Sequence, residues 1–210
     1  MKSDHVEGFS LYTNSGFRKY LNASERRRVL SAAQTFEPDE RLFALTLAWT
    51  GARVSEVLAL TPLSFQIGPG LVAIRTLKRR RHHVREVPIP RKLVVALNRH
   101  FRLTRLQQNA RRADSRLWPW SRTTAWRLIK RVMTKAGVVG TQACPKGLRH
   151  AFGVATLGIV PFSIRQKWLG HARAATTDIY SAVCGPEEIA FARSFWNERG
   201  ATRRLGQMHR

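Results

Sequence analysis

Acidic residues and cysteines are both scarce in this chain of 210 residues. It has 13 Asp and Glu against 37 Lys and Arg, which leaves a formal net charge of +24. Two cysteines, Cys144 and Cys184, are too few for a disulfide framework, so a reducing cytoplasm is the expected location. The longest apolar run, Leu42–Trp49, is too short to span a bilayer, and residues 1–16 contain no apolar signal core. These shortages argue against a disulfide-rich secreted protein and against a membrane protein.

The cationic excess is far larger than solubility requires, and it predicts a polyanionic partner. A ribosomal or chromatin-like packing protein is one explanation. However, 43% of the residues are hydrophobic and six are tryptophan, which favours a packed domain over a disordered basic tail. A chain of this length can bury one good core, or one large and one small domain.

Periodic patterns predict a mainly α-helical protein with a small antiparallel β-sheet. Residues 1–20 show no clear period, so we expect an N-terminal arm over residues 1–23 and a single catalytic domain over residues 24–210. Ser24 is the expected cap of the first helix, and Pro38 and Gly51 mark the start and stop of the second. The predicted helices span residues 24–36, 38–50, 54–60, 90–108, 121–137, 147–157, 161–169, 177–183 and 186–197, and the strands span 71–77 and 84–89.

The helix predicted over residues 121–137 has two distinct faces. Its apolar face contains Ala125, Leu128 and Ile129 and is expected to face the core. The opposite face is basic, as on a membrane-surface helix, but on this chain a phosphate-facing helix is the preferred interpretation. The DNA-binding residues predicted on this face are Arg122, Arg127, Lys130 and Arg131.

Four short segments combine the side chains needed for covalent chemistry on a nucleic-acid phosphate. They read TGARVSEVLAL from Thr50, LKRRRHH from Leu77, KGLRHAFG from Lys146 and LGHARAATTDIY from Leu169. A tyrosine can attack a phosphodiester, and cations can stabilise the charge that builds on the phosphate oxygens. In this order and spacing, the segments resemble the catalytic domain of the tyrosine recombinases, also called phage integrases, over roughly residues 24–192.

The resemblance assigns a role to each matching residue. It implies that Tyr180 is the nucleophile, which forms a 3′-phosphotyrosyl bond and releases a 5′-hydroxyl. Arg53 and Arg149 would grip the non-bridging oxygens, since the planar guanidinium binds two oxygens at once. Lys78 would be the general acid for the leaving 5′-oxygen. The other implied groups are Lys146, which stands where the family usually has histidine and would assist proton transfer, His171, which would hydrogen-bond the phosphate, and the supporting residues Glu56 and His150.

The resemblance also implies the partners. Double-stranded DNA would be the substrate, with Arg79, Arg80 and Arg81 of the hairpin tip as further DNA-binding residues, and neither a metal nor a cofactor would be needed. The protein would be a monomer when free and a homo-tetramer on synapsed DNA, with the helix of residues 186–197 exchanged between protomers. A bacterial, nucleoid-associated location follows from that function.

Several alternatives stay open at this level. Arg53 could simply pair with Glu56, His150 could be a core histidine, and Tyr180 could be a packing residue. A type IB topoisomerase and a non-catalytic DNA-binding regulator are the alternative functions. No separate core-binding domain is expected: either the protein works with one domain, like the similarly sized fimbrial-switch invertases, or the sequence is a piece of a longer chain.

Overall fold

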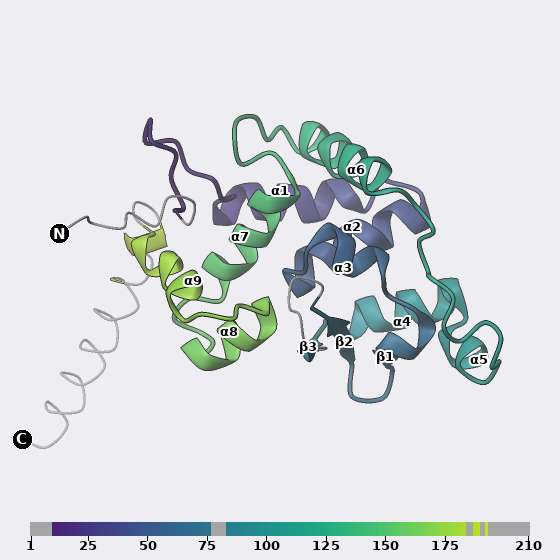
Figure 1. The fold of residues 1–210 in the computed structure, drawn as a ribbon. Helices are drawn as coiled ribbons and strands as arrows, with labels where there is room; N and C mark the ends of the chain where they lie inside the picture. Colours follow the sequence, from purple (N-terminus) through teal and green to yellow (C-terminus); the bar gives the residue numbers. More distant parts are fainter. Residues whose placement is uncertain (1–9, 77–82, 184–186, 190–191, 193–210) are drawn as a thin grey trace, which may run out of the picture.

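The structure is a computed structural model, and it describes residues 10–76, 83–183, 187–189 and 192. As predicted, the described residues are mainly helical with one small antiparallel sheet, here of three strands (Figure 1). None of the described helices is long and apolar enough to cross a membrane. The elements are α1 (Ala23–Ala33), α2 (Pro38–Thr50), α3 (Val54–Leu58), η1 (Pro62–Ser64), β1 (Phe65–Gln66), β2 (Leu71–Arg75), β3 (Val84–Pro88), α4 (Arg91–Phe101), α5 (Leu103–Gln107), α6 (Arg122–Lys135), α7 (Pro145–Ala155), α8 (Phe162–Leu169), α9 (Ala175–Asp178) and η2 (Ile179–Ala182).

The helix starts follow local capping chemistry. Asn22, rather than the predicted Ser24, caps α1: its Oδ1 accepts a hydrogen bond from Glu25 N at 2.8 Å, and the Glu25 carboxylate accepts one from Asn22 N at 3.0 Å. This reciprocal pair satisfies two backbone donors at once, so it is preferred over a cap two residues later. α2 begins at Pro38 and ends at Gly51, as predicted.

The predicted helix of residues 90–108 is wrong at one point, because Arg102 divides it into α4 and α5. Arg102 has a left-handed backbone with φ of 54°. The break turns α5 back toward the sheet, so that Leu103 is buried and the Gln107 side chain donates to the carbonyls of Pro62 and Phe65. These tertiary contacts offset the cost of the left-handed backbone at Arg102. The helical pattern of the sequence gave no sign of this conformation.

The β2–β3 hairpin agrees with the sequence prediction. Its antiparallel register runs from Leu71 opposite Pro88 to Arg75 opposite Val84. β1, which has only two residues and pairs with β2, was not predicted. The predicted basic tip, including Lys78 and Arg79–Arg81, lies outside the described residues, as does most of the segment predicted as the helix 186–197, of which residues 187–189 and 192 are helical.

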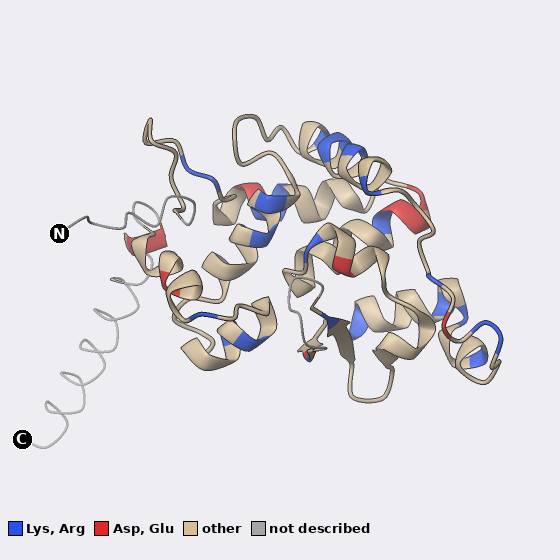
Figure 2. Cartoon of the chain, viewed as in Figure 1, with Lys and Arg blue, Asp and Glu red and all other residues tan. Residues whose placement is uncertain are grey.

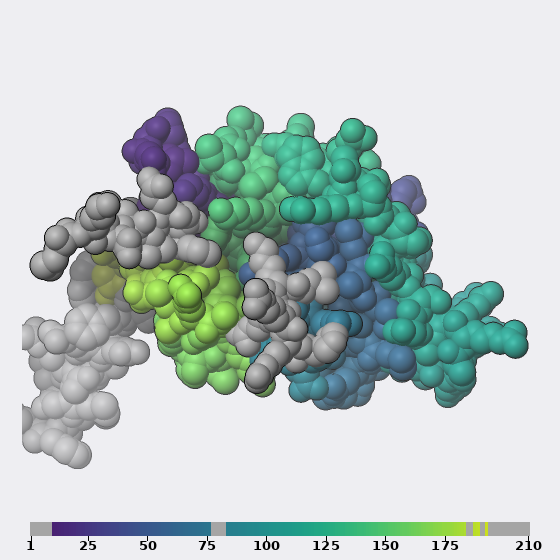
Figure 3. All heavy atoms as spheres, in the orientation of Figure 1, coloured from purple at the N-terminus to yellow at the C-terminus, as the bar shows by residue number. Residues whose placement is uncertain are grey.

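Two hydrophobic clusters hold the chain together. The large core joins α1–α7 and the sheet, and near its centre Trp118 packs edge-to-face against Phe43 and Phe101. Figure 3 shows the segment around α8, in light green, to the left of the blue segments that belong to the large core. The small cluster consists of Leu11, Tyr20, Phe152, Val154, Leu169, Tyr180 and Val183.

The small cluster anchors part of the N-terminal arm that was predicted over residues 1–23. Leu11 and Tyr20 are both buried in it, and Tyr12 forms an antiparallel bridge with Arg18. The apolar side chains that anchor this segment are isolated in sequence, so no periodic signal announces them. The segment therefore belongs to the folded body and helps to enclose the C-terminal elements.

Candidate active site

The segment that carries Arg53 is fixed by a helix end. Gly51 ends α2 with φ of 60°, and a Cβ placed on it would lie 2.4 Å from Phe152 Cδ1, so only glycine fits there. Arg53 then opens α3, with its side chain 30% exposed. Its Nη1 lies 2.9 Å from Glu56 Oε1, so the ion pair considered from the sequence is present. The exposed part of the guanidinium is still open to solvent.

Glu56 is the centre of a buried charge network. Besides Arg53 Nη1, its carboxylate accepts hydrogen bonds from Arg53 N at 2.9 Å and from Arg85 Nη2 at 2.7 Å. Burial works to raise the pKa of Glu56, but Arg85 and then Arg53 outweigh it and hold the pKa below its ordinary value. Glu56 therefore stays ionised and holds the Arg53 side chain.

Arg149 connects the two halves of the site. It lies on α7, is buried, and donates to the carbonyls of Gly51 and Leu169, both at 2.6 Å. Burial, and next the charge of Arg53, lower its pKa to about 10, so it remains cationic at neutral pH. Both acceptors are neutral carbonyls, which leaves the charge available to an anion.

Tyr180 is completely buried in the small cluster. Its ring lies against the backbone of α7, since a Cβ on Gly153 would come within 2.2 Å of Tyr180 Cζ. The Tyr180 hydroxyl lies 3.3 Å from His150 Nδ1. The His171 ring stacks on the Tyr180 ring, with 6.3 Å between the ring centroids. Burial raises the pKa of Tyr180, against the opposing charges of Arg149 and other arginines. In this state Tyr180 packs as a core residue.

Both site histidines are neutral at physiological pH. Burial, and next the charge of Arg149, lower the pKa of His171 to about 3. Burial, and next the charges of Lys146 and Arg149, lower the pKa of His150 to about 4. His171 Nδ1 lies 2.9 Å from the Thr177 hydroxyl, and His171 also lines a cavity of about 220 Å³ together with Lys167. His171 is therefore held by α9 at the edge of an open hollow.

The remaining predicted site residues differ in exposure and in their partners. Lys146 is exposed on the first turn of α7, whereas Lys78 lies outside the described residues. Figure 2 shows Lys and Arg positions, in blue, along the ribbon of α6. Of the predicted DNA-binding residues on this helix, Arg122 and Arg127 are exposed. The two others predicted to bind DNA have internal partners: Lys130 donates to Ala143 O at 2.8 Å, and Arg131 makes two bonds to Glu40 at 2.9 and 3.0 Å.

Sequence reasoning missed two buried arginines, Arg85 and Arg165. Arg85 had a detectable signal, because β3 alternates and a charged residue occupies one of its inward positions. Arg165 on α8 is also buried and lies over the ring of Phe162 at 5.5 Å. Its charge acts against the burial that raises the pKa of Tyr180. No pattern in the helix distinguishes it from a surface arginine.

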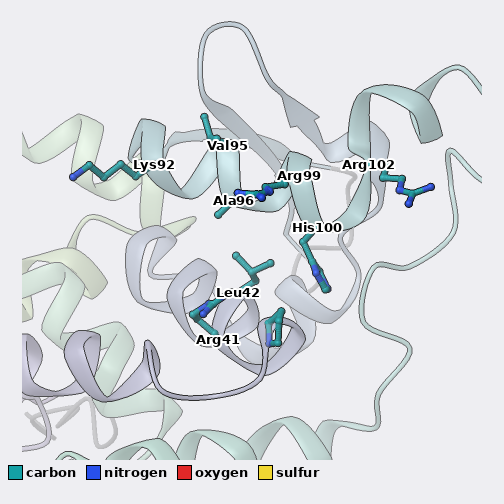
Figure 4. A pocket seen from close by; sticks show the side chains of 9 residues that line it. Arg41, Leu42, Lys92, Val95, Ala96, Arg99, His100 and Arg102 are labelled. Carbon is teal, nitrogen blue, oxygen red and sulfur yellow. The ribbon is translucent and has the colours of Figure 1, made fainter.

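A second cavity, of about 530 Å³, lies between α2 and α4, away from these residues (Figure 4). Its lining includes Arg41, Lys92, Arg99 and Arg102 but none of the predicted site residues. Among the described residues, no group of three or more His, Cys, Asp or Glu side chains could hold a metal ion.

The sequence model of the phage integrase family matches residues 19–184. Tyrosine recombinase XerA of Thermococcus kodakarensis is 32% identical over 172 residues, which cover 79% of this chain and 58% of that protein. This chain thus spans less than two thirds of the length of that relative. The crystal structure of XerA recombinase superimposes with a TM-score of 0.68 at 25% identity, over 86% of this chain and 64% of that one. XerH site-specific recombinase bound to its difH substrate has the same fold, with a TM-score of 0.66 at 18% identity over 88% of this chain and 59% of that one.

Proposed function

The chain belongs to the phage integrase family of tyrosine recombinases, and from this premise we propose that it cleaves and rejoins double-stranded DNA through Tyr180. The observation that carries the proposal is the convergence of distant segments on one tyrosine. His150 reaches it from α7, and the His171 ring stacks on the Tyr180 ring from the segment after α8. The charge of Arg149, also on α7, acts on the pKa of Tyr180, and Arg149 donates to the carbonyl of Gly51, two residues before Arg53.

The proposed reaction begins when the Tyr180 oxygen attacks phosphorus. The new bond joins tyrosine to the 3′-phosphate, and the bond from phosphorus to the 5′-oxygen breaks. Arg53 and Arg149 stabilise the charge on the non-bridging oxygens, and Lys78 protonates the leaving oxygen. If the Thr177 hydroxyl donates to Nδ1 of neutral His171, the Nε2–H of that ring is the donor for the phosphate. Rejoining is the reverse reaction.

Lys146 assists as the Tyr180 proton passes to solvent water. His150 is the nearer group in the buried state, but a histidine with a pKa of about 4 is a weak base. The tyrosine must also leave its buried position to meet DNA. An exposed ammonium on the first turn of α7 can stabilise the phenolate that forms, and replacing Lys146 by His, the usual residue of the family, should retain more cleavage than Lys146→Ala.

The test uses a library of nicked duplexes of random sequence, in which cleavage near the nick releases a short fragment and traps the enzyme. Wild-type protein should form a complex that survives denaturation, and sequencing its DNA gives the target. Tyr180→Phe should bind DNA yet form no adduct, and Tyr12→Phe is the matched control. An adduct with Tyr180→Phe would remove Tyr180 as nucleophile, and relaxation of supercoiled DNA without synapsis would favour the topoisomerase alternative.

The proposed assembly is a monomer that becomes a tetramer on its paired DNA sites. Strand exchange joins two duplexes and so needs four active sites. Deletion of the chain from Pro186 onward should spare most of the DNA binding and abolish recombination, as measured by gel shift and by product formation. A truncated protein that still assembles and recombines would exclude an exchanged C-terminal helix.

A further inference from the structure

Arg85 occupies a position that the β-strand reserves for the core. Along β3, Val84, Glu86 and Pro88 are exposed, while Arg85 and Val87 are buried. An arginine in such a position is unfavourable unless its N–H donors find acceptors. Those acceptors explain what the residue does.

Three separate segments accept hydrogen bonds from this one guanidinium. Arg85 Nη2 donates to Glu56 Oε2 at 2.7 Å, and Nη1 donates to Thr76 Oγ1 at 2.9 Å. Arg85 Nε donates to the Trp168 carbonyl at 2.7 Å. The planar fork can reach all three only in one orientation, so it fixes α3, the end of β2 and the end of α8 relative to one another.

Each of these segments carries one group of the proposed reaction. Glu56 binds Arg53 directly. Thr76 stands two residues before Lys78 in the sequence, and Trp168 stands three before His171. The intervening Gly170 has φ of 66°, and a Cβ on it would lie 3.0 Å from Arg85 Cζ, so the loop before His171 is shaped around this guanidinium.

We propose that Arg85 is a positioning residue that holds Arg53, the base of the Lys78 hairpin and His171 in register for catalysis. The inference rests on the proposed function. Arg85 contacts no reacting atom, and loss of its fork displaces groups that do. Misplacement of reacting groups slows the chemical step without weakening binding to DNA.

The decisive variant is Arg85→Lys, which keeps the charge but cannot make all three bonds. Its matched control is Arg75→Lys, the same change at an exposed position near the same end of the hairpin. Both are measured with the nicked duplex recovered by wild-type protein, in single-turnover adduct formation and in DNA affinity. Arg85→Lys should cleave about 10²-fold more slowly with unchanged affinity, and Arg75→Lys should cleave normally.

A second substrate separates positioning from a merely structural role. A bridging 5′-phosphorothiolate has a leaving group that needs no proton, so the defect of Arg85→Lys should shrink on it if the Lys78 hairpin is displaced. Thr76→Val, which removes one acceptor, should show the same pattern more weakly and serves if Arg85→Lys does not fold. The inference would be overturned if Arg85→Lys cleaved at the normal rate or had equal defects on both substrates. It would also be overturned if weaker DNA affinity or a smaller folded fraction explained the slower cleavage. If wild-type protein forms no adduct, the proposed function itself fails.

Discussion

The two hydrophobic clusters differ in size and in what they hold. The large core spans seven helices and the sheet, and it supports the segment that presents Arg53 with its side chain partly in solvent. The small cluster has seven buried side chains among the described residues, and it encloses Tyr180 completely. Arg149 joins them through the carbonyls of Gly51 and Leu169.

The difference between the two clusters indicates which part of the site moves. A buried tyrosine cannot attack a phosphate, so it must be released before cleavage. Release from the small cluster disturbs less apolar surface than any change in the large core, and regions with few buried contacts open at lower free energy. Under the proposed function, the half that binds phosphate is therefore the fixed part, and Tyr180, the proposed nucleophile, is the part that moves.

Leucine truncation should separate the two clusters most strongly. Leu47→Ala in the large core should lower the free energy of unfolding by about 2–5 kcal/mol. Leu169→Ala should lower it less, because the small cluster opens locally, but should speed amide exchange around residues 169–183. Urea unfolding and hydrogen exchange measure the two effects. If both variants lost the same free energy of unfolding, the two clusters would unfold as one unit.

Arg149→Lys should break the link between the clusters and remove a bidentate phosphate ligand. We expect single-turnover cleavage to slow by about 10²- to 10³-fold, as for loss of an oxyanion donor. Arg99→Lys, an exposed arginine of α4, is the matched control. A near-normal rate for Arg149→Lys would contradict the assigned role.

Acid should weaken the protein through His150 and His171. Their pKa values, about 4 and about 3, lie below that of an unfolded histidine, so the unfolded state binds protons first as pH falls. The stabilising contribution is fully present above about pH 6.5 and is lost toward the folded values, at about 1.4 kcal/mol per pH unit for each histidine. Urea unfolding between these limits measures the slope. His150→Phe should flatten it.

Gly153→Ala should release the tyrosine with the smallest change to the fold. The added methyl takes the space of the Tyr180 ring, so the pKa of Tyr180, raised by burial, should fall toward its ordinary value. The pKa of Tyr180 is measured from tyrosinate absorbance as pH rises. The signal of the Gly153→Ala/Tyr180→Phe double variant is subtracted to remove the contribution of the other tyrosines. Cleavage should change only a few-fold. An unshifted titration would mean that the ring stays buried.

Patterns along the chain were enough for most of the architecture. Apolar periodicity predicted α6 and the hairpin, because each of these elements buries one face regardless of its partners. Pro38 and Gly51, with the apolar run between them, predicted α2. The cap at Asn22 was missed because two neighbouring residues, Asn22 and Ser24, can both cap a helix. The break at Arg102 was missed because it depends on where α5 packs. Leu11 and Tyr20 were missed because a buried segment without periodicity has no local signal.

The sequence by itself determined the family, the fold class and the chemical set of arginines, histidine and tyrosine, since residue type and spacing carry that information. It could not show that Tyr180 is enclosed, or that Arg85 is the inward arginine joining three segments. Only the tertiary structure decided these points. Arg85 donates to a carbonyl 83 residues away, and the cluster around Tyr180 includes Leu11 from the other end of the chain. No local pattern encodes contacts between segments so far apart in the sequence.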